Sequence, residues 1–220
     1  MNMRAMLVSL GLGAVGLSLN GCQVVGGAID NYQRESTHEV KAEYRGLEGK
    51  TFAVVVSADR YIQSDFPDVV DYLTTKVTER LSMPTNRPTP SGYVPSKEVL
   101  TYLYDHPGWT TKSMADVAKG LGGVDAIVLI ELSEFRLREP GNQYEWDGVA
   151  SGTVAVVSMQ SNVPDEYVFQ KSVTVKFPGK KGYGPEQLSQ SAVMSALALR
   201  FIDRATWSFY DHEEPYRPEY

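Results

Sequence analysis

Hydrophobic residues repeat along the chain with two periods, one typical of strands and one of helices. The apolar runs from Lys50 to Ser57 and from Val124 to Leu132 are rich in β-branched residues and predict two buried strands, the second of them central in a sheet. Between them, apolar side chains recur at every fourth position and predict a helical stripe formed by Val69, Leu73, Val77 and Leu81.

Shorter signals place further elements around these two strands. A short first strand is expected at 39–44, and helices are expected at 97–104, after a cap at Ser96, and at 112–120. The Gly120–Gly123 segment after the last of these helices is typical of a helix end followed by a turn.

The second half of the chain changes to a period of two. Segments 148–159 and 165–177 are predicted to be strands, and in the second one Lys171 is the single break in an apolar face. Pro185 is expected to open a long helix. Its stripe facing the sheet is predicted as Leu188, Ala192, Ser195, Leu199 and Ile202.

The order of these elements is strand, three helices, three strands and a helix. This order predicts an α/β or α+β fold, in which one domain forms a sandwich of a mixed β-sheet covered by helices.

The amino-terminal segment has the layout of an export signal. Arg4 supplies a basic start, and Ala5 to Leu19 is apolar but shorter than the ~20 residues of a membrane-spanning helix. The segment ends in Leu19-Asn20-Gly21-Cys22, which resembles the lipobox of bacterial lipoproteins, although Asn20 departs from the usual small residue.

The resemblance implies a signal peptide over 1–21, cleavage between Gly21 and Cys22, and lipid attachment at Cys22. The alternative is an ordinary signal peptide followed by a chance cysteine. Cys22 is the only cysteine of the chain, and acylation would remove the redox liability of an unpaired thiol in an exported protein.

A lipid on Cys22 has consequences for location and domain organisation. Two or more acyl chains anchor a protein stably, whereas one chain binds only marginally. Because Gln23 rather than Asp follows the cysteine, we expect the outer membrane, with the domain facing the periplasm. The predicted organisation is a lipidated tether over 22–47, a domain over 48–210 and a loose tail over 211–220.

Charge and glycine spacing narrow the possible ligands. The formal net charge of −6 argues against nucleic acid and against a basic membrane-binding patch. The glycines of Gly120–Gly123 follow a helix and precede a strand, the reverse of the order that a dinucleotide site needs. We therefore expect no cofactor.

Catalytic and metal-binding patterns are weak. His38, His106 and His212 are far apart in the sequence, and His106 is expected to end a helix. The acidic Asp211–Glu214 segment is a poor metal site, and there is no G-x-S-x-G motif. Carboxylates at Glu131 and Glu134 border a predicted strand end, so a glycosidase-like hydrolase stays an alternative that the spacing does not favour. The prediction is a non-catalytic protein without a metal.

Four segments of the chain form a familiar series. They are Phe52-Ala-Val-Val-Val56, the helix with Leu73 and Leu81, Gly120-Leu-Gly-Gly-Val-Asp-Ala-Ile-Val128, and Gly152-Thr-Val-Ala-Val-Val157. Together they resemble the amino-terminal domain of TolB and its relatives, the CsgG-like curli-export lipoproteins and the LpoB-like activators of penicillin-binding proteins. The resemblance covers about 50–210 and rests mainly on the order of elements, with a proline-rich connection from Pro84 to Pro95 that is longer than the pattern.

This resemblance implies a periplasmic lipoprotein that works through protein contacts in the cell envelope, and it transfers no catalytic residue. A first alternative is a subunit or accessory of an oligomeric secretion pore, in which the 148–177 hairpin would insert into a membrane. An envelope hydrolase is the second alternative. A homo-oligomer stays open.

Aromatic residues offer anchors for such contacts. Core packing is the favoured interpretation for Trp207 and Phe209, whereas Tyr216 and Tyr220 are equally compatible with contact and packing. The other members of the set are Tyr102, Tyr104, Trp109 and Tyr210.

Overall fold

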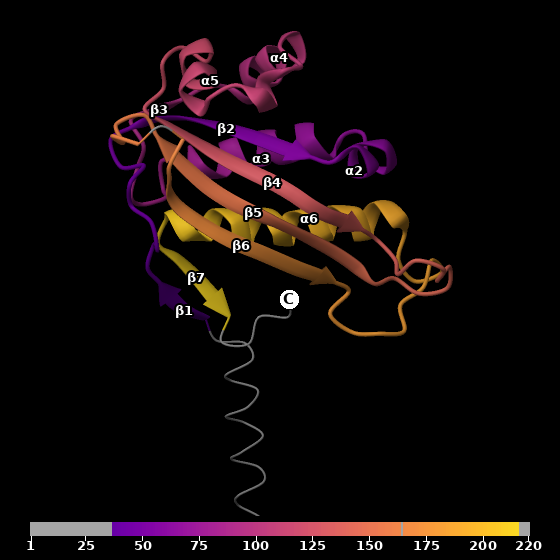
Figure 1. The fold of residues 1–220 in the computed structure, drawn as a ribbon. Helices are drawn as coiled ribbons and strands as arrows, with labels where there is room; N and C mark the ends of the chain where they lie inside the picture. The colour runs from indigo at the N-terminus through magenta and orange to yellow at the C-terminus, as the bar shows by residue number, and fades with distance from the viewer. Residues whose placement is uncertain (1–36, 164, 216–220) are drawn as a thin grey trace, which may run out of the picture. The chain divides into compact units, whose positions relative to one another are not determined.

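A five-stranded mixed sheet forms the centre of the protein (Figure 1). The computed structural model describes residues 37–163 and 165–215, and its main compact unit runs from Glu39 to Glu214. The strand order is β3-β2-β4-β5-β6, in which β2 is parallel to β3 and β4 while β4, β5 and β6 are antiparallel neighbours. These strands are β2 (Thr51–Ala58), β3 (Gly92–Tyr93), β4 (Ala126–Arg136), β5 (Gly148–Ser158) and β6 (Tyr167–Phe177).

Helices pack on this sheet, and a small second sheet completes the described elements. The helices are α2 (Arg60–Asp65), α3 (Val69–Leu81), α4 (Ser96–Asp105), α5 (Met114–Gly120) and α6 (Gln190–Thr206), with the short 3-10 helices η1 (Trp109–Thr111) and η2 (Trp207–Phe209). β1 (Thr37–Val40) and β7 (His212–Pro215) form the two-stranded sheet. The predicted α+β fold with a mixed, helix-covered sheet in one domain is confirmed.

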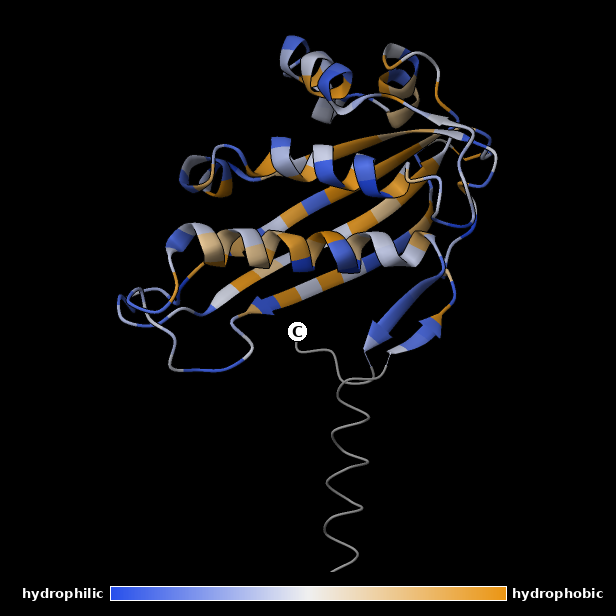
Figure 2. Cartoon of the chain, turned by 180° about the vertical axis from the view of Figure 1, so that it is seen from behind, coloured by the Kyte–Doolittle hydropathy of each residue, from blue (hydrophilic) through white to orange (hydrophobic). Residues whose placement is uncertain are grey.

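The two faces of the central sheet carry different helices. Helices α3 and α6 cross one face and bury the main core there, and Figure 2 shows both helices lying across the strands on this face. Helices α4 and α5 cover the other face over β2 and β4 only, with a core built around Val55, Val99, Val117 and Leu129. Since both faces of β2 are covered, its central residues are all buried, as the apolar run predicts.

A clasp between Thr51 and Asp125 sets the register of the two central parallel strands. The Asp125 carboxylate accepts hydrogen bonds from the Thr51 backbone N–H at 2.9 Å and from its hydroxyl at 2.7 Å. In return, the Asp125 N–H donates to the Thr51 carbonyl oxygen and hydroxyl oxygen. Pairing of Phe52 with Ala126 follows directly, so the clasp fixes which side chains face each layer of helices.

The turn before this clasp confirms the predicted helix end. Gly122 and Gly123 have positive φ angles of 88° and 77°. The Gly123 N–H bonds the carbonyl of Ala118, and the Gly122 N–H bonds that of Lys119. This is a Schellman motif, which requires residues that tolerate a left-handed backbone.

A bulge changes the direction of side chains in the second half of β4. The register with β5 shifts between Leu132 and Glu134, so one extra residue is inserted. Before the bulge, even-numbered residues such as Ile130 face α3 and α6; after it, Phe135 faces them instead. The predicted strand end at 132 is therefore wrong, because the strand continues to Arg136 after the bulge.

Gly152 lies opposite this bulge and allows α6 to approach the sheet closely. A Cβ atom on Gly152 would lie 2.7 Å from the Glu131 carbonyl oxygen and 3.2 Å from the Phe201 ring. A side chain at this position would therefore clash with backbone on one side and with the core of α6 on the other.

The last helix differs from its prediction in start and phase. It begins at Gln190 after a Ser189 cap, not at Pro185, so Leu188 precedes the helix. Ala192, Ser195 and Leu199 of the predicted stripe are exposed. The buried face is shifted because the larger side chains take it, namely Val193, Leu197, Phe201 and Ile202 with Ala198 and Ala205.

Two further helix starts differ from expectation. Helix α2 is not predicted by the sequence pattern; it has six residues, and Asp59 caps it by accepting from the Tyr61 and Ile62 backbone N–H groups. Ser96 is the first residue of α4 rather than its cap, which is Pro95 without a side-chain hydrogen bond. In α3, the stripe from Val69 to Leu81 is buried as predicted.

The described chain continues on both sides of 48–210. Asp211 accepts a hydrogen bond from the Ala42 backbone N–H at 2.9 Å and pairs with Lys41 and Arg45. The backbone bond to Ala42 and the Lys41 ammonium lower the pKa of Asp211 below its ordinary value. Residues 41–45 and 211 are therefore joined, while 216–220 lie outside the described residues.

The predicted hairpin strands β5 and β6 belong to the central sheet, where β5 lies between β4 and β6.

In the described part of the chain, no helix is both long enough and apolar enough to cross a membrane.

We predict that Asp125→Asn lowers the free energy of unfolding at neutral pH. We also expect this free energy to fall less steeply with decreasing pH in the variant than in the wild type. The hydrogen bonds from the backbone N–H and hydroxyl of Thr51 lower the pKa of Asp125 below its ordinary value of 3.8. The unfolded chain therefore binds the proton more tightly, and stability falls as the pH drops through this range. Urea midpoints at about pH 7 and about pH 3.5 measure both effects.

The matched control for this variant is Asp105→Asn, since Asp105 is exposed and makes no side-chain hydrogen bond among the described residues. Equal acid slopes in the wild type and Asp125→Asn would show that the clasp does not carry the pH dependence.

We predict that Gly152→Ala lowers the free energy of unfolding by about 1–3 kcal/mol through overpacking. Gly92→Ala is the control, because its Cβ would meet only the Thr51 methyl group at 3.5 Å, an ordinary contact. Denaturant unfolding of both variants measures the difference, and a Gly152→Ala protein as stable as Gly92→Ala would contradict the close approach of α6.

Candidate functional site

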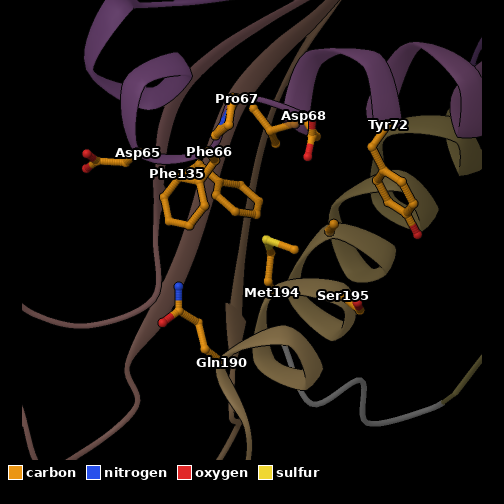
Figure 3. A pocket seen from close by; sticks show the side chains of 11 residues that line it. Asp65, Phe66, Pro67, Asp68, Tyr72, Phe135, Gln190, Met194 and Ser195 are labelled. Atoms are coloured by element: carbon orange, nitrogen blue, oxygen red, sulfur yellow. The ribbon is translucent and has the colours of Figure 1, made fainter.

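An apolar groove opens between the amino-terminal parts of α3 and α6 (Figure 3). Its volume is about 350 Å³, within the range of sites that hold small molecules or single side chains. The described residues that line it are Asp65, Phe66, Pro67, Asp68, Val69, Tyr72, Phe135, Gln190, Met194, Ser195 and Ala198.

Two phenylalanines form one end of the groove. The rings of Phe66 and Phe135 meet edge to face, with centroids 5.0 Å apart and an angle of 75°. Phe135 faces this layer because of the β4 bulge. Phe66 is held where α2 ends, since Pro67 disfavours continuation of the helix and the Phe66 N–H bonds the Ile62 carbonyl at 2.8 Å.

Helix α6 supplies the opposite wall. Met194 is 37% exposed, and in Figure 3 its side chain points from α6 toward the two phenyl rings. The helix start nearby is fixed by Ser189, whose hydroxyl accepts from the Ala192 N–H at 3.2 Å. An unbranched, polarisable methionine adapts its shape to different apolar groups, which suits a binding surface.

The two helices are joined near their carboxyl ends. Arg80 of α3 lies 2.9 Å from the carboxylate of Asp203 of α6. Burial raises the pKa of Asp203, and the Arg80 guanidinium partly offsets this effect by favouring the charged form. This contact holds α3 and α6 together at their carboxyl ends, whereas the groove lies at their amino ends.

The charged side chains in the described lining are the carboxylates of Asp65 and Asp68, both exposed. Asp68 precedes α3 without making a side-chain cap bond. The arrangement therefore combines an aromatic and aliphatic interior with a negative rim. It can hold an apolar group that carries a positive charge beside it.

The predicted lipidation and cleavage residues, Cys22 and Gly21, lie outside the described residues. His106 ends α4 as predicted, with its N–H and its ring nitrogen Nδ1 both near the Tyr102 carbonyl oxygen. His212 stacks on Trp207 with ring centroids 4.7 Å apart. A helix end therefore places His106, and ring packing places His212.

The predicted carboxylates are also dispersed. Glu131 and Glu134 lie inside β4 rather than at its end, and Glu134 pairs with Arg136 at 2.7 Å. Glu214 pairs with Arg204, away from Asp211 and its partners. Among residues 37–163 and 165–215, no three His, Cys, Asp or Glu side chains form a group that could hold a metal ion.

The aromatic residues divide between packing and exposure. Phe209 is buried, and Trp207 packs against the main core, which confirms the favoured interpretation. Tyr216 and Tyr220 lie outside the described residues. Tyr104 is 87% exposed.

Sequence reasoning missed the groove. A signal was present at Phe66-Pro67, which separates two helical segments and leaves an aromatic side chain at the break. No local signal marks the bulge that turns Phe135 inward, and the shifted phase of α6 hid Met194.

Comparison with known proteins gives distant likenesses in fold. No protein-family model matches the chain, and no curated protein matches it significantly. A subunit of a PelC dodecamer from Paraburkholderia phytofirmans is 11% identical, with a TM-score of 0.43 over 80% of this chain and 97% of that chain. Lipoprotein GNA1162 from Neisseria meningitidis is 11% identical, with a TM-score of 0.44 over 70% of this chain and 97% of that chain.

A third structure, the hypothetical protein CT253 from Chlamydia trachomatis, is 12% identical with a TM-score of 0.42 over 70% of this chain and 92% of that chain. At these identities and TM-scores, the likenesses neither assign a family nor transfer a function. The resemblance to the TolB, CsgG-like and LpoB-like proteins stays a prediction.

Proposed function

We propose that this chain is a lipid-anchored protein of the cell envelope that acts by binding a protein partner, not by catalysis. The apolar groove between α3 and α6 carries the proposal. It accepts an apolar side chain of the partner, and the carboxylates of Asp65 and Asp68 receive a neighbouring Lys or Arg.

The energetics of interfaces support this use of the groove. A few buried apolar or aromatic anchors provide most of the binding energy in protein complexes, and surrounding polar contacts exclude water. Phe66, Phe135 and Met194 offer such a pocket, and the rim carboxylates add orientation and a faster encounter with a basic segment.

The anchor belongs to the same proposal. Acylation of Cys22 would hold the domain at the membrane, which Gln23 indicates is the outer membrane on its periplasmic side. Confinement to a surface raises the local concentration of a partner in the same envelope, so a groove of modest size is enough for a functional contact.

A photo-reactive amino acid at Met194 tests the groove in intact cells. We expect irradiation to join the full-length chain to one discrete envelope protein. The same amino acid at Leu199 is the matched control, because Leu199 is 43% exposed on the same helix but does not line the groove.

The Asp65→Asn and Asp68→Asn double variant should lower the yield of this product about tenfold, since each neutral rim residue removes attraction for a basic partner. Equal products from positions 194 and 199 would contradict a specific groove. A product of twice the chain mass would instead assign the groove to a second copy of this chain, as in the oligomer alternative.

Removal of the acylation site tests the anchor. We expect Cys22→Ala to abolish incorporation of labelled palmitate, because the predicted acceptor thiol is absent. A second variant, in which an ordinary cleavable secretory signal replaces residues 1–22, should be found in the soluble periplasmic fraction. This second variant keeps the test valid if Cys22→Ala prevents signal cleavage. Sedimentation of the signal-replaced chain with membranes at high salt would contradict lipid anchoring.

A further inference from the structure

A second concave region lies at the carboxyl end of β2. Its volume is about 690 Å³, and it is bounded by the end of β2, the start of α3 and the side of α4. Strand β3 pairs with β2 only at Thr51 and Phe52, so on this side no described strand continues beside the last residues of β2, whereas on the other side β4 pairs with β2 as far as Ala58.

The topology of the parallel strands makes this a characteristic ligand position. The chain leaves the carboxyl end of β2 for α2 and α3 on one face of the sheet, and it leaves the neighbouring strand β3 for α4 on the other face. Where connections diverge to opposite faces in this way, a crevice opens beyond the carboxyl ends of the strands, and ligands bind there in many α/β proteins.

Trp109 divides this region from a third hollow. It lines the 690 Å³ hollow and also a neighbouring hollow of about 210 Å³ that includes Glu131 of β4 and Tyr167 at the start of β6. Its backbone N–H donates a hydrogen bond to the His106 carbonyl oxygen at 2.9 Å, and its side chain is partly buried against the core under α4 and α5. The two hollows with Trp109 between them are called the Trp109 groove below.

Aromatic side chains recur along this groove. Tyr104 is 87% exposed in the first hollow, and Tyr167 is 42% exposed in the second. With Trp109 between them, the groove offers three aromatic groups from α4, η1 and β6. Aromatic side chains of this kind stack on the apolar face of a ligand ring, and the polar groups at the edge of that ligand ring stay accessible.

Several polar side chains in the groove lack partners among the described residues, although Gln63 and Asp165 bond backbone groups. Within the described residues, no hydrogen bond or ion pair is formed by the side chains of Arg60, Asp71 or Thr101 in the first hollow, or of Lys112 or Glu131 in the second. Other charged groups are paired, among them Arg136 with Glu134 and Arg80 with Asp203. The groove therefore presents donors and acceptors that a ligand can engage.

These features fit one class of ligand. A pyranose ring has an apolar face that stacks on indole or phenol and hydroxyl groups that both donate and accept hydrogen bonds. Each hollow contains both signs of charge, Arg60 with Asp71 in the first and Lys112 with Glu131 and Asp165 in the second, where the Asp165 carboxylate accepts a hydrogen bond from the Met114 backbone N–H. Neither hollow is therefore lined by charges of one sign, as a site for a charged polymer would be. A nucleic acid is disfavoured by the net charge of −6.

An extended peptide is less well matched, because peptide anchors prefer apolar pockets from which charged side chains are depleted. We propose that the Trp109 groove binds a polysaccharide chain of uncharged sugars, with rings stacked on Trp109, Tyr104 and Tyr167.

Oligosaccharide titration of the full-length chain tests the proposal. The protein is purified in a polyoxyethylene detergent, because a maltoside headgroup would itself compete. Cellohexaose, maltohexaose and chitohexaose are the uncharged probes, hexagalacturonate is the acidic probe, and calorimetry measures binding. We expect at least one uncharged hexasaccharide to bind with a dissociation constant below about 1 mM and more tightly than hexagalacturonate.

Tyr104→Ala should weaken this binding about tenfold without affecting folding, because the side chain is almost fully exposed. Trp109→Ala should weaken it further, with circular dichroism as the check on folding. Tyr144→Ala is the matched control, since Tyr144 is 88% exposed and does not line the groove.

Three results would overturn the proposal. The first is no binding of any uncharged hexasaccharide, and the second is binding that Tyr104→Ala and Trp109→Ala leave unchanged. The third is binding of unfolded casein, lost in the same variants, without binding of any sugar, which would assign the groove to extended peptides. None of these results bears on the groove between α3 and α6.

Discussion

The clasp between Thr51 and Asp125 is the contact on which the rest of the fold depends. It joins Thr51, the first residue of β2, to Asp125, the residue just before β4 and 74 positions away in the sequence, with hydrogen bonds in both directions. A slip of one residue between β2 and β4 would exchange their two faces. Because helices cover both faces of this pair, such a slip would remove two cores at once.

Both concave regions follow from the same pair of strands. Helix α3 leaves the carboxyl end of β2 on one face, while α4 and α5 lie on the other, so the space beyond β2 cannot be filled by a single layer. On the first face, α3 and α6 are joined near their carboxyl ends by Arg80 and Asp203, and the groove lies at their amino ends. The start of α3 therefore helps to form both regions, and the start of α6 completes the groove on the first face.

The sequence predicts the layers well and the sites poorly, for physical reasons. Periodicity identifies the central strands, the α3 stripe and the Gly122–Gly123 turn because each depends on neighbours within a few positions. The β4 bulge depends on the pairing with Gly152 and on packing against Phe201, which are distant in sequence. The pattern predicts the wrong face of α6 because two adjacent stripes are both apolar, and the volumes of the side chains that fit against the sheet decide which stripe is buried.

The link between α2 and α3 gives the two regions a shared boundary. Pro67 lines the groove between α3 and α6 and also the hollow at the end of β2. Along α3, Val69 and Tyr72 face the former, whereas Val70 and Asp71 face the latter. A ligand that displaces this link must therefore alter both regions. Where such a displacement lowers or raises the affinity of the second region, linkage requires that occupation of the second region change the affinity of the first by the same factor.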